Sequence, residues 1–283
     1  MNVSIKQVLN FPPVKIIIGI SVCFSLLVVV QNFISKPILY SIFKDKDIAD
    51  PIIHCISILV ILLSYYILFR FYDKREIKEL SLKKIPKEMF GGFVFGFFTI
   101  SLSIFILYLI GYYKAISITT TLYSVKLFTV LVVAALIEDL FIRGLIIREC
   151  EKWLGTNVTI VIGMLFETWH VFNDNSNIFS LFTDLVWGFT LAMLFIYTKR
   201  IWLPFFFHLG WNFAQPFYGS NLTGLDNMGS IIQSKFNGPE LFTGGAVGIE
   251  NSIITVTLLL LIGIILYYRA KKEGKFINRK LFK

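Results

Sequence analysis

Eight apolar runs, each close to the length of a membrane-spanning helix, dominate this 283-residue sequence. A helix needs about 20 apolar residues to cross roughly 30 Å of hydrocarbon, and it satisfies its own backbone hydrogen bonds there. The sequence therefore predicts an all-α polytopic membrane protein with about eight transmembrane helices. The runs lie at about residues 14–34, 51–69, 89–112, 122–150, 157–173, 177–198, 201–217 and 250–268.

The basic residues predict which helix ends face the cytoplasm. Residues 70–87 contain seven Lys or Arg, and the tail from Arg269 contains seven more. Further basic residues at 148–152 and 199–200 fall on the same side when the runs are threaded in order, as cytoplasmic loops require. An even number of spans with both termini inside, N-in and C-in, fits every loop. This topology explains the net charge of +9. The expected partner is therefore the lipid bilayer, and no nucleic-acid partner is expected.

The fourth run contains three charges, in the stretch ALIEDLFIRG. A charged side chain near the centre of a spanning helix costs roughly 2.5–3.5 kcal/mol, so each of these needs a partner. Asp139 and Arg143 are four residues apart and share a helix face, which predicts an ion pair. Glu138 is five residues from Arg143 and is left to find its partner on another helix.

Two histidines in apolar runs are the candidate partners of Glu138. Glu138 precedes Leu154 by sixteen residues and His170 follows it by sixteen, so an antiparallel hairpin places them at similar depth. His208 and Asn212 are four apart and present an imidazole and a carboxamide on one face. Counted along its helix, His208 lies about 10 Å shallower, a difference that helix tilt has to absorb.

Two other acids stand in the same apolar runs. Glu167 lies three residues before His170 and forms an E-x-x-H pair, which is weak evidence of a metal ligand without a matching second helix. Glu167 and Asp184 are interpreted instead as cavity-lining or helix-pairing groups.

Three motifs in order resemble those of the CPBP (CAAX protease and bacteriocin-processing) family, also called Abi. EDLFIR at 138–143, FETWH at 166–170 and HLGWN at 208–212 are similar to its E-E-x-x-x-R, F-x-x-x-H and H-x-x-x-N. The resemblance covers about residues 120–217. It implies an intramembrane endopeptidase with Glu138, His170, His208 and Asn212 as catalytic residues, supported by Asp139 and Arg143.

One departure from the family pattern is Asp139, where the family has its second glutamate. If this acid mainly holds Arg143, the shorter side chain should be tolerated. If it has a direct role, activity is in doubt.

The resemblance implies a metal-independent mechanism in which Glu138 activates a water molecule held also by His170, while His208 and Asn212 donate hydrogen bonds to the oxyanion. This interpretation expects no cofactor. The alternative places zinc on Glu138, His170 and His208, with water as the fourth ligand. The sequence has no H-E-x-x-H, and Asn is a poor zinc ligand, so the metal-free version is favoured.

Two other functions use the same residues. A non-catalytic scaffold for bacteriocin immunity or signalling is motivated by Asp139. A proton-coupled carrier is motivated by the intramembrane acids and histidines, although the chain lacks the paired half-chain symmetry of such carriers.

The chain divides into three predicted parts. Residues 1–115 hold transmembrane helices 1–3 and a basic cytoplasmic loop, and residues 116–217 hold the CPBP-like catalytic core of helices 4–7. Residues 218–283 hold an outer loop, which is either a lid or a disordered connection, and the C-terminal helix with its basic tail. The Lys-, Asn- and Ile-rich composition favours a bacterial cytoplasmic membrane, with a membrane-associated peptide or protein as substrate.

Overall fold

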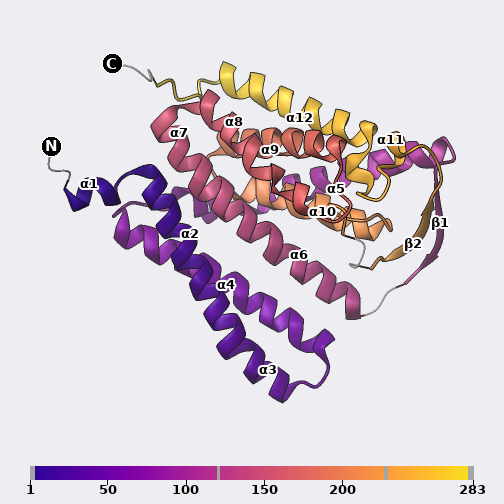
Figure 1. Ribbon diagram of the computed structural model, residues 1–283, viewed down its shortest axis with the longest axis horizontal. Coiled ribbons are helices and arrows are strands. Elements are labelled where there is room, and N and C mark those ends of the chain that lie inside the picture. Colours follow the sequence, from indigo (N-terminus) through magenta and orange to yellow (C-terminus); the bar gives the residue numbers. More distant parts are fainter. Residues whose placement is uncertain (1–3, 120–121, 226–228, 280–283) are drawn as a thin grey trace.

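The computed structural model describes residues 4–119, 122–225 and 229–279. Most of the chain is helical (Figure 1). The α-helices are α1 (Ile5–Leu9), α2 (Pro12–Val29), α3 (Lys36–Ile42), α4 (Lys46–Tyr72), α5 (Ile85–Leu109), α6 (Leu122–Phe141), α7 (Arg148–Leu154), α8 (Thr156–Glu167), α9 (Ile178–Thr198), α10 (Trp202–Phe217), α11 (Glu240–Thr243) and α12 (Ile253–Lys272). Short π or 3₁₀ segments are η1 (Val30–Ser35), η2 (Lys78–Leu80), η3 (Leu82–Lys84), η4 (Ile142–Ile147), η5 (Thr168–Phe172) and η6 (Ile249–Asn251).

Each of the eight apolar runs is helical, and the chain is an all-α polytopic membrane protein in its main architecture. Within the described residues, five helical stretches are long and apolar enough to cross a membrane by length and composition. These are Pro12–Ile42, Lys46–Tyr72, Lys78–Leu109, Ile178–Thr198 and Ile253–Lys272. The number and orientation of spans stay predictions.

The helices that carry the predicted site residues lie outside this set of five. Glu138 lies on α6, His170 follows α8, and His208 lies on α10. The run at 157–173 is not one helix, because α8 ends at Glu167 after 12 residues and continues as the 3₁₀ segment η5. The 16 residues of α10 also fall short of the roughly 20 that a perpendicular crossing needs.

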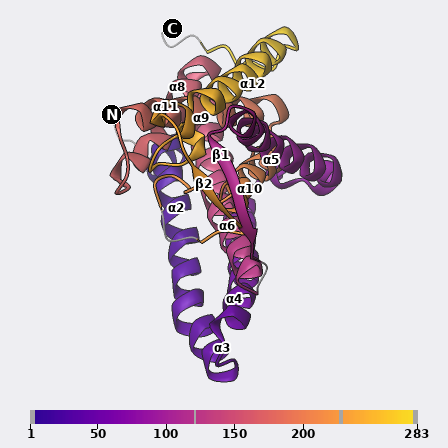
Figure 2. The same cartoon turned by 90° about the vertical axis from the view of Figure 1, so that its right-hand side faces the viewer.

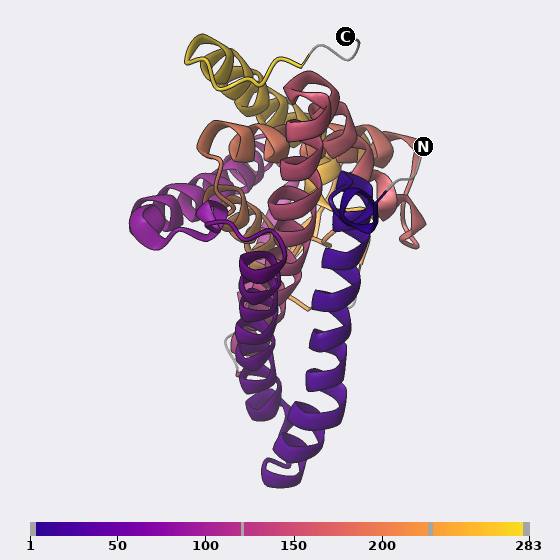
Figure 3. The same ribbon diagram turned by 90° about the vertical axis from the view of Figure 1, so that its left-hand side faces the viewer.

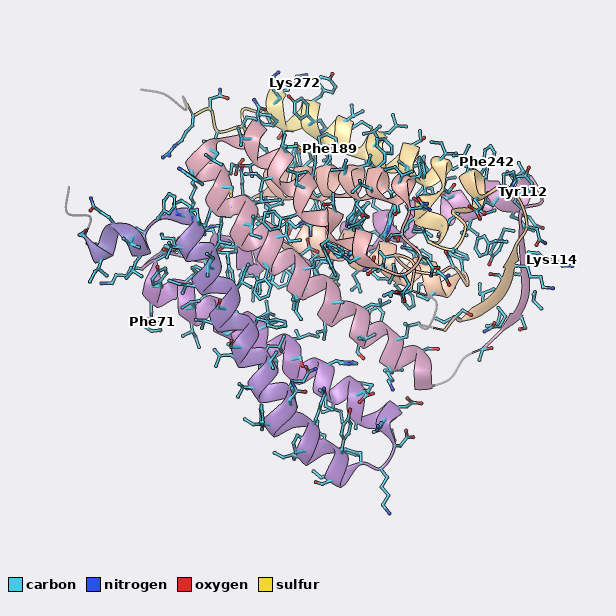
Figure 4. The ribbon with its side chains drawn as sticks, viewed as in Figure 1. Phe71, Tyr112, Lys114, Phe189, Phe242 and Lys272 are labelled. Atoms are coloured by element: carbon cyan, nitrogen blue, oxygen red, sulfur yellow. The ribbon has the colours of Figure 1, made fainter. Side chains whose placement is uncertain are left out.

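One feature falls outside the all-α prediction. Strands β1 (Tyr113–Ile118) and β2 (Ile232–Phe236) form an antiparallel pair that joins the loop before α6 to the long loop before α12. A two-stranded ribbon is marginal alone, and aromatic contacts anchor this one. Tyr113 packs on Phe236 at 5.2 Å between ring centroids, and Tyr112 packs on Phe242 of α11 (Figure 4).

Helices α6 and α7 form one long bent helix, with η4 between them, that runs diagonally through the molecule (Figure 1). The hairpin of α2, α3 and α4 lies against this helix and projects away from the rest of the protein (Figures 2 and 3). Its buried residues include Tyr65, whose hydroxyl lies 2.6 Å from the carbonyl oxygen of Gly144 in η4. The hairpin therefore supports the central helix just beyond Glu138.

Close packing of α5 on α10 fixes the helix that carries His208. A Cβ atom on Gly96 would lie 2.0 Å from the carbonyl oxygen of Phe207, and one on Gly210 would lie 2.2 Å from that of Phe93. Both distances are impossible for a real side chain, so glycine is required at these two crossings. The backbones approach closely there, as small residues allow in membrane helix pairs.

Candidate active site

Glu138 and Asp139 lie in the last turn of α6, and the π segment η4 follows at once. Such π turns inside α-helices occur frequently at functional sites. Arg143 lies on η4 and is fully buried, with its Nε atom 3.4 Å from Oδ1 of Asp139. The predicted Asp139–Arg143 pair is confirmed by this contact.

Arg143 has a second carboxylate partner on another helix. Its guanidinium contacts the carboxylate of Glu167 at the end of α8, and both side chains are buried. Of the two roles expected for Glu167, the structure shows helix pairing, since Glu167 does not line the cavity beside Glu138. Arg143 thus joins α6 to α8 and holds the segment before His170 in place.

Both histidines face Glu138 through Nε2. His170 Nε2 lies 4.0 Å from Oε1 of Glu138, and His208 Nε2 lies 3.9 Å from Oε2. The equal depth expected of Glu138 and His170 is confirmed, with Gly155 forming the turn of the hairpin at a φ of +82°. The crossing of α10 over α6 brings His208 to the same level despite its shallower count along the helix.

The other ring nitrogen of each histidine faces a carboxylate. His208 Nδ1 donates to Oδ2 of Asp139 at 2.9 Å, and His170 Nδ1 lies 3.7 Å from Oδ1 of Asp184. A carboxylate on Nδ1 fixes the orientation and the tautomer of an imidazole, leaving Nε2 to face the reacting group. Asp139 therefore contacts Arg143 and His208 at once.

Glu138, the two histidines and Asp184 border one cavity of about 160 Å³. All four predicted catalytic residues belong to its lining. The full lining consists of Leu131, Ala134, Glu138, Trp169, His170, Thr183, Asp184, Trp187, His208, Trp211, Asn212, Leu222, Thr223, Leu225 and Glu250. Among the side chains that line the cavity, Oε1 of Glu138 and Oδ2 of Asp184 are buried without a hydrogen-bond partner. Buried polar atoms are normally satisfied, so these two oxygens are available to a water or substrate in the cavity.

Residues 120–214 match the family model described as type II CAAX prenyl endopeptidase Rce1-like. Over this segment the chain is similar to the CAAX protease family. The match spans about a third of the chain and includes Glu138, His170, His208 and Asn212. No curated protein and no solved structure matches the chain significantly.

Several side chains that complete the cavity of this CAAX protease-like segment were not assigned to the site from the sequence. Trp187 packs edge-on against the His208 ring at 5.1 Å between centroids. Asp184 stands out in the sequence as an acid in an apolar run, but nothing there pairs it with His170. Glu250 lies outside the family match, and only its position next to an apolar run hints at a role.

The long loop before α12, expected to be a lid or a disordered connection, contributes part of the cavity wall. Leu222, Thr223 and Leu225 line the cavity. Asn173 Nδ2 donates to the Thr223 carbonyl at 2.7 Å, and Asn175 Nδ2 donates to that of Gly224 at 2.6 Å. The described part of this loop is therefore an ordered cover over the site.

Glu250 fixes the same loop from the opposite side. Its carboxylate accepts hydrogen bonds from the Thr223 amide at 2.6 Å, from Gln215 Nε2 at 2.7 Å and from Trp211 Nε1 at 3.3 Å. Because Trp211 and Gln215 belong to α10, Glu250 joins the loop to the helix that carries His208 and Asn212.

The side chains of Glu138, His170 and His208 stand somewhat wider apart than the ligands of a tetrahedral zinc site. Among the described residues, no group of three His, Cys, Asp or Glu side chains is placed to hold a metal ion. Ligand atoms of a tetrahedral zinc site lie about 3.4 Å apart, given bonds of about 2.0–2.2 Å. The contacts of 4.0 and 3.9 Å are wider than that.

Proposed function

We propose that this chain is an intramembrane endopeptidase that hydrolyses a peptide bond with a water molecule activated by Glu138. The family match supports a CAAX-type endopeptidase, and one geometric observation carries the mechanism. The Nε2 atoms of His170 and His208 lie about 4 Å from the two oxygens of the Glu138 carboxylate. A water molecule that hydrogen-bonds at about 2.8 Å to each partner bridges gaps of this size.

Glu138 is the general base in this proposal. Its carboxylate takes a proton from the water, and the hydroxide attacks the substrate carbonyl carbon. His170 orients the same water through Nε2, because its Nδ1 faces Asp184. Glu138 then gives the proton to the leaving amine as the tetrahedral intermediate breaks down, which regenerates the carboxylate.

His208 and Asn212 are proposed to stabilise the oxyanion. Both belong to α10 and both line the cavity. The Asp139 carboxylate holds Nδ1 of His208, so the Nε2 edge of the ring faces the cavity. Preorganised donors of this kind stabilise the charge that develops on the substrate carbonyl oxygen.

The proposed substrate is a membrane-associated peptide or protein. Trp169 borders the cavity and is 51% exposed, and Phe172 and Ile178 beyond it are 87% and 85% exposed. Such an apolar rim suits contact with lipid rather than water. The described lining has three carboxylates, on Glu138, Asp184 and Glu250, and no Lys or Arg. A substrate that is neutral or cationic near the scissile bond is therefore favoured.

The topology that accompanies this proposal has eight spans with both termini inside a bacterial cytoplasmic membrane. It predicts that Lys272 is cytoplasmic and Lys114 external. Cysteine variants at these two positions, made in a Cys55→Ser background, test it with a membrane-impermeant maleimide in intact cells. Labelling of Lys272→Cys without lysis would contradict the orientation.

The function itself is tested by comparing peptide termini, by mass spectrometry, in cells that express the wild type, Glu138→Gln or Glu76→Gln. Glu76 is an exposed acid away from the cavity, so its variant is the matched control. A new terminus seen with the wild type and the control but absent with Glu138→Gln supports proteolysis. If all three profiles agree while the cells share a growth or immunity phenotype, the chain acts as a scaffold.

Metal dependence is tested on the purified protein with that substrate. Activity that survives dialysis against a chelator, in a preparation free of zinc by elemental analysis, supports the glutamate mechanism. Activity that is lost on chelation and returns with Zn²⁺ contradicts it.

A further inference from the structure

Helices α5, α9, α10 and α12 surround a second cavity that shares no lining residue with the one around Glu138. It measures about 760 Å³, within the roughly 300–1,000 Å³ of small-molecule sites. Figures 2 and 3 show α5 and α12 diverging on this side of the molecule. The lining consists of Lys84, Lys87, Glu88, Gly91, Gly92, Phe95, Leu194, Tyr197, Thr198, Arg200, Leu203, Phe207, Ile262, Ile265, Leu266, Arg269 and Lys275.

Positive charge gathers at one end of this cavity. Lys84 and Lys87 lie at the start of α5, and Arg269 lies in the last turn of α12. The only acid of the described lining, Glu88, is already engaged by Arg200 at 2.8 and 3.1 Å. Lys84 and Lys87 are exposed and have no ion pair or side-chain hydrogen bond within the described residues. Their charges are available to a ligand.

The rest of the lining is apolar and open to the side. Leu203, Phe207 and Leu266 form part of the wall, while Phe95 and Ile265 are 61% and 57% exposed. An exposed apolar side chain on a transmembrane helix faces lipid. The cavity is thus a groove that is basic at the helix ends and apolar along the helices.

We propose that this groove binds one anionic phospholipid. Its phosphate would lie among Lys84, Lys87 and Arg269, and an acyl chain would lie in the apolar part between α5 and α12. A basic pocket between membrane helices recognises acidic lipid headgroups. A free phosphate ion makes no favourable contact with the apolar wall, whereas an acyl chain does. The site is independent of the catalytic cavity and of the proposed proteolysis.

The headgroup contacts are tested by native mass spectrometry of the full-length protein, released from micelles that contain equal phosphatidylglycerol and phosphatidylcholine with the same acyl chains. The wild type is expected to retain one phosphatidylglycerol preferentially. Each basic side chain near an anionic lipid contributes about fivefold, so Lys84→Gln, Lys87→Gln and Arg269→Gln together should lower its binding about 100-fold. Removal of three exposed lysines elsewhere, Lys44→Gln, Lys114→Gln and Lys235→Gln, is the matched control and should leave binding unchanged.

The apolar part is tested by filling the groove. Gly91 lines the groove, and a Cβ atom there meets nothing within 4 Å, so Gly91→Trp is chosen to place a large side chain at this position. This variant should lose the bound lipid while all basic residues are kept. Thermal unfolding in lipid-free detergent verifies that each variant is folded.

Three results would overturn the proposal. The first is equal retention of both lipids by the wild type, and the second is the same loss of phosphatidylglycerol in the control triple variant as in the test variant. The third is displacement of the lipid by millimolar inorganic phosphate, which would make the site one for free anions.

Discussion

His208 donates through Nδ1 to Oδ2 of Asp139 at 2.9 Å, and both side chains are buried. The other oxygen of the same carboxylate lies 3.4 Å from Nε of Arg143. Asp139 therefore does not serve the arginine alone, because it bridges the arginine and a candidate catalytic imidazole. The aspartate side chain is therefore long enough to reach both partners.

The first prediction concerns this bridge. Asp139→Asn should lower kcat by at least about 10²-fold with a small change in KM, because an amide no longer fixes the tautomer and orientation of His208. Asp139→Glu, which keeps the charge, should retain more activity than Asp139→Asn. Both are measured on the substrate found from peptide termini, with thermal unfolding as the check on folding. A wild-type rate in Asp139→Asn would show that the bridge has no part in turnover.

A second prediction follows from the longer contact on the other histidine. His170 Nδ1 lies 3.7 Å from Asp184, and Asp184 is less buried than Asp139. Because this contact is weaker, it should contribute less to catalysis. Asp184→Asn is therefore expected to lower kcat only about tenfold. The two Asn variants are compared under the same conditions. If Asp184→Asn lowers kcat more than Asp139→Asn does, the contact of Asp184 with His170 matters more for turnover than that of Asp139 with His208, and the prediction is wrong.

Much of the site could be predicted from local spacing. The pairing of Asp139 with Arg143 follows from helix periodicity, and the equal depth of Glu138 and His170 follows from counting residues on each side of one turn. These arguments work because a helix in lipid has a fixed rise and buries its charges in pairs. They need no information on how the helices cross.

Other features depend on helix crossings and could not be read from spacing. The contact between Arg143 and Glu167 requires the packing of α8 against η4, and the π geometry of η4 has no pattern in the sequence. Asp184 on α9 reaches His170 in η5 through the packing of α9 against the end of α8. Glu250 and the loop at 222–225 come to the site from beyond the matched segment, through contacts with Trp211 and Gln215.

The third prediction concerns that loop. Glu250→Gln should increase amide hydrogen exchange of residues 222–225 by about 10–100-fold, because hydrogen bonds to a buried charged group are worth about 1.5–3 kcal/mol. The amide of a glutamine cannot accept from the Thr223 amide, Gln215 and Trp211 at once, whereas the carboxylate does. Exchange is measured by mass spectrometry on the full-length protein in detergent. Unchanged protection of this segment, with Glu76→Gln as the reference, would show that Glu250 does not hold the loop.

The last prediction concerns pH and the end of α4, outside the spanning helices. Asp73 accepts from Lys15 Nζ at 2.5 Å and from Arg75 Nε at 3.2 Å. Burial acts to raise the pKa of Asp73, but the hydrogen bonds and charges of Lys15 and Arg75 outweigh it, so the pKa lies below its usual value.

A carboxyl group whose pKa is lower in the folded state stabilises the protein above its unfolded pKa of about 3.9, and this contribution is lost as the pH falls through the folded value. Asp73→Asn should therefore lower the unfolding temperature at pH 7 and make it less dependent on pH between about 5 and 3 than in the wild type. Asp174→Asn, at an exposed position, is the matched control. Parallel pH curves for the wild type and Asp73→Asn would show that the ion pairs of Asp73 contribute nothing to stability.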